Sequence, residues 1–149
     1  MQQIFNFNIN FLSRIIGIDY GLKRVGVAVT DPLQIIAGGL TTVENKNILH
    51  FLKDYFLKNE VEAIVVGYPV NMDNTVTEIT GEVDKFLDIL KKNFPVCPVH
   101  KIDERLTSRM ASQTILDSGI GKMKRRNKAL VDKVSATIIL QSYLEQIKR

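Results

Sequence analysis

The first third of the chain has short apolar runs rich in β-branched residues, a pattern that predicts strands. Three such runs are RIIGIDYG (14–21), RVGVAVT (24–30) and QIIAGGLTTV (34–43). Short turns that contain Gly, Lys, Asp and Pro separate them, which is typical of an antiparallel meander. Residues 1–13 precede this pattern and form an N-terminal extension; their alternation of Phe and Ile with Asn fits either an edge strand or an unstructured leader.

The rest of the chain alternates between helical and strand periodicity. Helical spacing predicts helices over 46–59, 77–93, 108–119 and 129–147, and continuous apolar runs predict strands over 62–69 and 95–103. Strands that are apolar throughout are expected where both faces of a sheet are covered. The prediction is therefore an α/β fold in a single domain, residues 14–149. Three antiparallel strands are followed by alternating helices and parallel strands, giving a mixed sheet with helices on both faces.

Charge and composition narrow the range of functions. The 149 residues carry a net charge of +4, with a sequence pI near 9.2, which mildly favours a polyanionic partner. The single cysteine, Cys97, lies in an apolar stretch and is interpreted as a buried structural thiol in a reducing cytosol. No apolar run is long enough to suggest a membrane span. The positive charge concentrates in GIGKMKRRNK, which predicts a basic loop containing Lys122, Lys124, Arg125, Arg126 and Lys128.

Asp19 is an acidic residue inside the apolar run IIGIDYG. Strand alternation places it on the same face as Gly17 and Gly21, and places Ile18 and Tyr20 on the other face. Small neighbours leave room for a ligand or for another backbone. A carboxylate in a central strand is costly unless it is paired or bound to a metal, so we favour a functional role over a turn-forming or edge-facing one.

Two further acidic positions are candidates for the same site. Asp103 and Glu104 follow the last predicted strand, at the end where ligands bind in open α/β sheets, although DERLTSRM also reads as a turn entering a helix. Asp132 heads a helical stripe with Ala136, Ile139 and Tyr143. Its competing interpretation is a charge in the first helical turn, where the helix dipole favours an acid.

Converging carboxylates repel one another and are stabilised by a divalent cation, and oxygen-only ligands suit Mg²⁺ or Mn²⁺. Such a site beside a basic loop indicates phosphodiester cleavage, in which metal ions activate a water and stabilise the leaving oxygen. His50 and His100 have no partner at metal-ligand spacing and are interpreted as packing or solvent-facing residues.

The segment VVGYPVNMDNT (65–75) leaves a predicted buried strand through Gly and Pro. Because it follows the carboxyl end of that strand, Asn71, Asp73 and Thr75 are candidates for a substrate loop. Capping of the next helix by Asp73, Asn74 or Thr75 is the structural alternative, and the two roles are compatible.

In order along the chain, GIDYGLKRVGVAVTDP, VVGYPVNMDNT, DERLTSRMA and KRRNKALVDKVSATIILQSYL resemble the YqgF family. The resemblance extends from about Arg14 to the C-terminus. It implies an RNase H-like fold related to RuvC resolvases, a cytoplasmic location and a metal-dependent nuclease that matures the 5′ end of pre-16S rRNA. Asn74 stands where the family's loop commonly has Gly, and the extension before Arg14 is longer than usual.

By motif position, the resemblance implies Asp19, an acid of DER and Asp132 as the catalytic metal ligands; we choose Glu104, with Asp103 as its alternative. The residues assigned to nucleic-acid binding are Lys23, Arg24, Arg105, Lys122, Lys124, Arg125, Arg126 and Lys128. Expected partners are structured RNA or branched DNA, with a ribosomal particle as a further one. Phosphate-binding charge carries no base information, so the alternatives stay open: a Holliday junction resolvase-like DNA endonuclease, or a non-catalytic ribosome-assembly factor.

Overall fold

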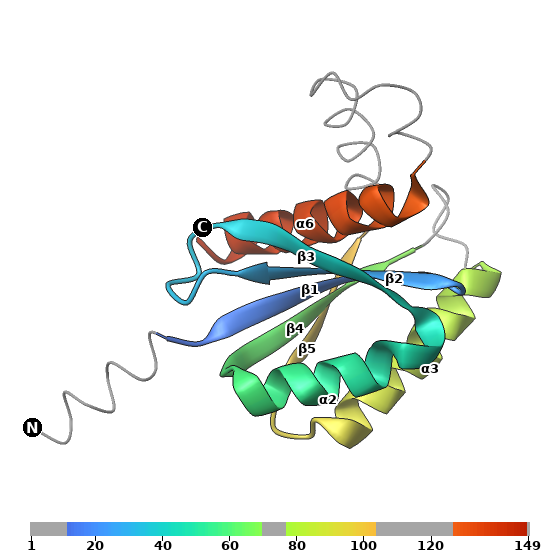
Figure 1. Ribbon diagram of the computed structural model, residues 1–149, viewed down its shortest axis with the longest axis horizontal. Helices are drawn as coiled ribbons and strands as arrows, with labels where there is room; N and C mark the ends of the chain where they lie inside the picture. The colour runs from blue at the N-terminus through green and yellow to red at the C-terminus, as the bar shows by residue number, and fades with distance from the viewer. Residues whose placement is uncertain (1–11, 70–76, 104–126, 149) are drawn as a thin grey trace, which may run out of the picture.

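The computed structural model describes residues 12–69, 77–103 and 127–148. These form a five-stranded sheet in the order β3-β2-β1-β4-β5, in which β1 pairs antiparallel with β2 and parallel with β4 (Figure 1). The strands are β1 (Arg14–Tyr20), β2 (Arg24–Thr30), β3 (Ala37–Glu44), β4 (Val61–Tyr68) and β5 (Val99–Asp103). The 3-10 turn η1 (Asn45–Asn47) leads into α2 (Ile48–Lys58), and the longer helices are α3 (Glu78–Asn93) and α6 (Lys128–Ile147).

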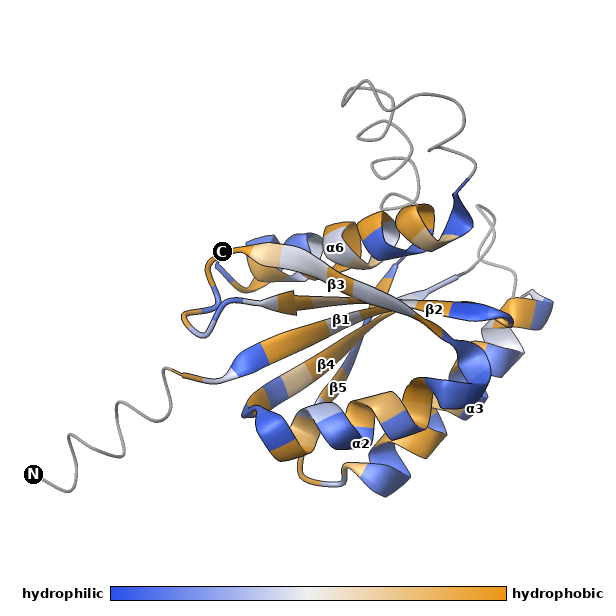
Figure 2. Cartoon of the chain, in the orientation of Figure 1, coloured by the Kyte–Doolittle hydropathy of each residue, from blue (hydrophilic) through white to orange (hydrophobic). Residues whose placement is uncertain are grey.

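The sheet separates two apolar cores, because strand alternation sends successive side chains to opposite faces (Figures 1 and 2). Helices α2 and α3 cover one face. This α2–α3 core contains Ile16, Ile18, Val25, Val27, Leu52, Ile64, Val66, Val83, Phe86 and Leu90. Helix α6 covers the other face, mainly over β2, β3 and β1. This α6 core contains Ile15, Ala28, Ala63, Val65, Ile102, Ala136, Ile139, Leu140 and Leu144.

The predicted mixed sheet with helices on both faces is confirmed, with two corrections at strand ends. The third strand begins at Ala37 rather than residue 34, because the carboxylate of Asp31 accepts hydrogen bonds from the backbone N–H groups of Leu33, Ile35 and Ile36. These three backbone N–H groups therefore belong to a turn and not to the strand. Gln34, within this turn, has a positive φ of 58°.

The last strand is also shorter than predicted. β5 begins at Val99, since Pro95 and Pro98 have no backbone N–H to give to a ladder. It is an edge strand in which only Ile102 is buried, so the expectation of two covered faces was wrong for it. The predicted helix over 108–119 lies outside the described residues.

Helix α3 begins with a capping box that the sequence analysis did not identify. The Thr77 hydroxyl accepts a hydrogen bond from the Thr80 backbone, and the Thr80 hydroxyl accepts one from the Thr77 backbone. Thr77 is therefore the cap, rather than Asp73, Asn74 or Thr75. The box has Thr at its fourth position instead of the usual Glu or Gln, which hides it in the sequence. None of the described helices is long and apolar enough to cross a membrane.

Candidate active site

Asp19 lies near the end of β1 and on the face covered by α6. Its neighbours Ile18 and Tyr20 pack in the α2–α3 core, whereas Ile15 belongs to the α6 core, so the predicted alternation is confirmed. The Asp19 residue is half-buried. Its carboxylate therefore stands at the edge of the α6 core, where the central strand ends.

Asp132 approaches the same point from α6. Its backbone carbonyl oxygen lies against Gly26 so closely that a Cβ on this glycine would overlap it. Gly26 is the partner of Asp19 in the β1–β2 register, and paired Cα atoms in antiparallel strands are about 5 Å apart. The fold thus places Asp19 and Asp132, which are 113 positions apart in the sequence (132 − 19), next to the same glycine, one in the paired strand and the other in the covering helix.

The helical stripe predicted for Asp132 is confirmed, because Ala136 and Ile139 are buried in the α6 core and Tyr143 packs against it. The competing interpretation of Asp132 is wrong. Helix α6 begins at Lys128 and its first turn contains no acidic residue, so Asp132 lies in the second turn. The helix dipole does not account for its position.

The glycines around Asp19 serve a different purpose from the one in our leading interpretation. A Cβ on Gly17 would lie 2.6 Å from the Leu140 Cβ, and one on Gly21 would overlap the carbonyl oxygen of Arg24. The small residues therefore admit another backbone, that of α6 and of the β1–β2 turn. Of the two options offered by the sequence, close backbone approach is the one observed.

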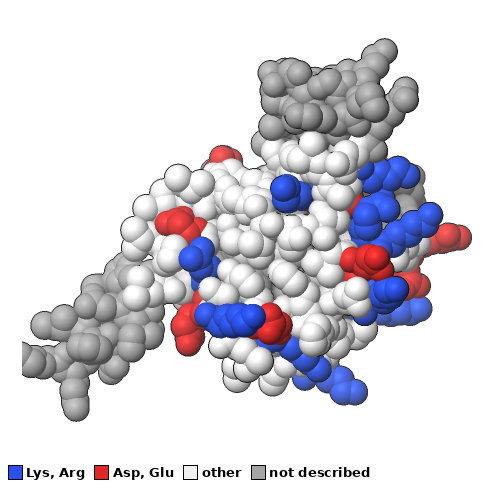
Figure 3. Space-filling model, viewed as in Figure 1, with Lys and Arg blue, Asp and Glu red and all other residues white. Residues whose placement is uncertain are grey.

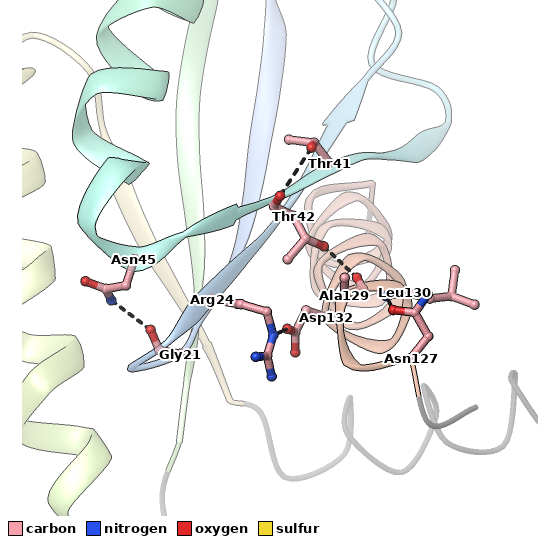
Figure 4. A network of polar contacts seen from close by, with 9 residues as sticks. All are labelled: Gly21, Arg24, Thr41, Thr42, Asn45, Asn127, Ala129, Leu130 and Asp132. Carbon is pink, nitrogen blue, oxygen red and sulfur yellow. Dashed lines mark hydrogen bonds and ion pairs between the residues drawn. The ribbon is translucent and has the colours of Figure 1, made fainter. Parts of the chain in front are cut away.

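Arg24, the first residue of β2, forms an ion pair with Asp132 (Figure 4). The Nε of Arg24 lies 3.2 Å from Oδ2 of Asp132, and the two side chains are 34% and 24% exposed. We predicted Arg24 as a nucleic-acid contact, but no local pattern in the sequence indicates this pairing. It depends on α6 crossing β2 at Gly26, which is two residues further along the same face of the strand.

Asn45 fixes the turn that carries Arg24, a role that the sequence analysis missed. Its side-chain amide donates a hydrogen bond to the carbonyl oxygen of Gly21 at 2.7 Å (Figure 4). Its backbone N–H donates to the carbonyl oxygen of Lys23 at 2.9 Å. Both ends of the turn are thereby tied to the end of β3. The base of the Arg24 side chain consequently has a defined position beside the carboxylate of Asp132.

Among the predicted acidic site residues that follow or end β4 and β5, Asp103 is described and Asp73 and Glu104 are not. Asp103 ends β5 and pairs with Tyr68, whose ring lies 4.4 Å from the ammonium group of Lys101. Because Ile102 packs in the α6 core, Asp103 projects from the opposite face of the sheet, away from the face of Asp19. Glu104 lies outside the described residues.

Within residues 12–69, 77–103 and 127–148, no group of three or more His, Cys, Asp or Glu side chains is arranged to hold a metal ion. Asp19 in β1 and Asp132 in α6 both lie beside Gly26 on the α6 side of the sheet, and carboxylate oxygens suit Mg²⁺ or Mn²⁺. Asp132 already faces a cationic group, the guanidinium of Arg24, so the donor chemistry at this point fits a cation.

Among the predicted nucleic-acid contacts, Lys23 and Lys128 are described and exposed. In the view of Figure 3, Lys and Arg gather on the right, where β2 and α3 begin in Figure 1, with Asp and Glu among them. The remaining predicted contacts, Arg105, Lys122, Lys124, Arg125 and Arg126, lie outside the described residues. So do Asn71, Asp73 and Thr75.

A groove of about 480 Å³ runs between β3 and the start of α6, close to the Arg24–Asp132 pair. Its polar lining residues include Thr41, Asn127 and Lys133. Thr42 also lines it, and its hydroxyl donates a hydrogen bond to the carbonyl oxygen of Ala129 at 2.5 Å. The sequence analysis had not selected any of these residues, because β3 and α6 are far apart in the chain.

The other nucleophile and base candidates lie elsewhere. Cys97 is buried, and this apolar environment raises the pKa of its thiol to about 11, which disfavours the reactive thiolate. His50 is exposed, and His100 stacks on Tyr143 with ring centroids 5.4 Å apart. The interpretation of these three residues as structural or solvent-facing is confirmed.

The architecture defines a class of protein, the RNase H-like fold of RuvC-type resolvases. Thermus thermophilus RuvC, in a complex with a Holliday junction substrate, superposes with a TM-score of 0.56 at 16% identity, covering 91% of this chain and 96% of that chain. A fowlpox virus resolvase in complex with Holliday junction DNA also gives a TM-score of 0.56, at 12% identity, over 91% of this chain and 99% of its own. At these sequence identities, the structural similarity shows a shared fold and no more.

Sequence relatives narrow the class to one family. The family described as RuvX, Holliday junction resolvase, matches residues 13–146, and this chain belongs to it. A Flavobacterium psychrophilum protein is 50% identical over 89% of this chain and 97% of its own length. A Porphyromonas gingivalis protein is 54% identical over 93% of this chain and its full length. Both are named as candidate pre-16S rRNA nucleases.

Proposed function

We propose that this protein is an endonuclease that hydrolyses a phosphodiester bond of structured RNA, with the 5′ end of pre-16S rRNA as its substrate. One observation carries the proposal: the carboxylate-bearing residues Asp19 and Asp132 meet at Gly26, at the end of the central strand of a RuvC-like fold. The names of the relatives supply the substrate. A cytoplasmic location is part of the proposal and agrees with a free, buried Cys97.

In this proposal Asp19, Asp132 and Glu104 hold Mg²⁺ or Mn²⁺. Glu104 is preferred to Asp103 because strand alternation puts Asp103 on the face opposite Asp19. A divalent ion at such a site activates water and stabilises the leaving oxygen. The chain's own contribution is to fix the carboxylates: β1 holds Asp19, and the close contact of α6 with Gly26 holds Asp132.

Positive charge around the site would bind the substrate backbone. The structure describes three of these basic residues, Lys23, Arg24 and Lys128. In the sequence, Arg105 and the basic segment 122–126 add further positive charge. The groove between β3 and α6 offers hydroxyl, amide and ammonium groups, the types of side chain that contact phosphate and sugar. These contacts position a strand without reading its sequence.

The test compares cleavage of a pre-16S rRNA 5′ fragment and of a four-way DNA junction by the purified protein, with Mg²⁺, Mn²⁺ or EDTA. We expect cutting of the RNA that requires metal and falls at least 100-fold in Asp19→Asn and Asp132→Asn. Asp54→Asn is the matched control, because Asp54 lies on α2 and pairs with Lys58 at 3.1 Å. Circular dichroism checks that all three variants fold.

The junction arm tests a second function, which the family description and the RuvC-like neighbours favour. Preferential cutting of the junction would replace RNA by branched DNA as the substrate. Binding of the RNA that survives both EDTA and the two aspartate replacements, with no cutting under any condition, would leave a non-catalytic assembly factor and reject the nuclease.

A further inference from the structure

The ion pair between Arg24 and Asp132 involves one of the proposed metal ligands. The Arg24 Nε contacts Oδ2 of Asp132 at 3.2 Å, so a cationic side chain already occupies one oxygen of a proposed metal ligand. Neighbouring contacts hold Arg24 in this position. Arg24 projects from the α6 face of β2, and the turn before it is tied down by Asn45 at both Gly21 and Lys23.

A divalent ion and the guanidinium of Arg24 compete for the same carboxylate. Like charges a few ångströms apart repel each other, and partial burial weakens the screening by water. Asp132 is 24% exposed, so this repulsion is felt at the site. Arg24 must therefore move away from Oδ2, or tilt from it, when Asp132 takes up the ion.

The Arg24 side chain has a route for this movement. The side chain is 34% exposed, follows exposed Lys23 in the chain and is not part of either core. A guanidinium presents a planar fork that binds phosphate through two parallel hydrogen bonds. The scissile phosphate, which must approach the same ion, is the nearest anion that such a displaced fork would meet.

We propose that Arg24 is a positioning residue that exchanges partners: it neutralises Asp132 before metal binds and pairs with the substrate phosphate afterwards. The inference rests on the proposed function, since it needs Asp132 to be a metal ligand. Its consequence is a coupling between two ligands. Because phosphate draws Arg24 away from Asp132, nucleic acid and metal each strengthen the binding of the other by the same factor.

A purely structural tether would behave differently. The Arg24 backbone is already held by pairing with Glu44 of β3, and α6 is already anchored at Gly26 and by the Thr42–Ala129 hydrogen bond. A partly exposed ion pair adds little to an assembly that these contacts already hold. If Arg24 were only a tether, its loss would loosen Asp132 and weaken the binding of metal.

The experiment measures the affinity for Mn²⁺ by calorimetry in the absence of nucleic acid. We expect Arg24→Gln to bind Mn²⁺ more tightly than wild type, by roughly threefold to tenfold, because a competing charge has gone. Arg24→Lys keeps the charge and should bind Mn²⁺ as wild type does. Lys46→Gln, an exposed cation on η1, is the matched control and should change the affinity by less than about twofold.

The second measurement is RNA binding by fluorescence anisotropy in EDTA and in Ca²⁺, with a gel confirming that the RNA stays intact. Wild type should bind more tightly with the ion than without it. Arg24→Gln should lose most of this gain, and Arg24→Lys, which lacks the fork, should lose part of it. Lys46→Gln should keep it.

Unchanged or weaker Mn²⁺ binding in Arg24→Gln, with an intact gain for RNA, would overturn the exchange and leave Arg24 as a tether. Failure of the proposed function looks different, since wild type would then bind no Mn²⁺, or Asp132→Asn would bind it as well as wild type. If Arg24→Gln does not fold, Arg24→Lys provides the test. An increase in RNA affinity with Ca²⁺ equal to that of wild type would then overturn the proposal.

Discussion

The carbonyl oxygen of Asp132 lies on Gly26, which leaves no room for a side chain at that position. This contact sets the height of α6 above β2. Because Gly26 also pairs with Asp19, the same contact brings the backbone of Asp132 close to the strand pair that carries Asp19. One glycine therefore links the packing of the helix to the geometry of the proposed site.

Replacing Gly26 by Ala should destabilise the protein by about 2–4 kcal/mol, since backbone atoms of α6 would have to shift to admit the methyl group. Urea unfolding measures the change. Gly38→Ala is the control in the neighbouring strand β3, where a Cβ would meet nothing within 4 Å, and it should stay within about 0.5 kcal/mol of wild type. Equal stabilities of the two variants would contradict the close packing of α6 on β2.

Thr80 connects the capping box of α3 to the end of β4. Its hydroxyl is buried, donates to the carbonyl oxygen of Pro69 at 2.6 Å and accepts from the backbone N–H of Thr77. Thr80→Val leaves both groups without this partner, so unfolding free energy should fall by about 1–3 kcal/mol. Thr137→Val removes a hydroxyl that donates to the Lys133 carbonyl one turn earlier in the same helix, and should cost much less. Similar losses in thermal unfolding would argue against the linking role of Thr80.

The turn after β2 depends on one carboxylate. Hydrogen bonds from the backbone N–H groups, led by that of Ile36, hold the pKa of Asp31 below its ordinary value. A lowered pKa means that the stabilisation is present above about pH 3.8 and is lost as the pH falls through the lower folded value. Asp31→Ala should reduce the hydrogen-exchange protection of Ile35 and Ile36, whereas Asp54→Ala on α2 should not. Unchanged protection in Asp31→Ala would exclude this role.

Cys97 should resist alkylation in the folded protein. Its pKa of about 11, against an ordinary value of 9.0, makes the thiolate roughly 100-fold scarcer at pH 8. Because folding raises the pKa, the contribution to stability is intact below pH 9 and disappears as the pH rises from 9 to 11. Labelling with iodoacetamide at pH 8 should be at least that much slower in native protein than in urea. Equal rates would show that the thiol is accessible.

Lys133 tests whether the β3–α6 groove binds a nucleic-acid strand. Its side chain passes over Gly39 and lines the groove. Lys133→Gln should weaken RNA binding at low salt and reduce the slope of log affinity against log salt by roughly 0.7–0.9, the value for one phosphate contact. Lys53→Gln, an exposed cation on α2, is the control. An unaltered slope in Lys133→Gln would exclude the groove from the binding surface.

Local sequence was a good guide wherever one interaction dominates. The alternation in β1 and β2 predicted which face each residue occupies, because a half-turn per residue leaves no freedom once one face is buried. The stripe that Asp132 heads in α6 followed from helical periodicity in the same way. The start of β3 could not be predicted in this way. Ile35 and Ile36 fit the apolar pattern of a strand, but the carboxylate of Asp31 holds them in a turn.

The sequence by itself determined the described strands and helices and their order, and it singled out Asp19 and Asp132 as candidates, since these depend on periodicity and on unusual residues in apolar runs. Only the tertiary structure decided that the glycines admit α6, that Asp132 and Arg24 pair, and that Asp103 faces away from Asp19. These facts depend on where α6 crosses the sheet. That crossing is fixed by packing between residues about a hundred positions apart, which no local pattern records.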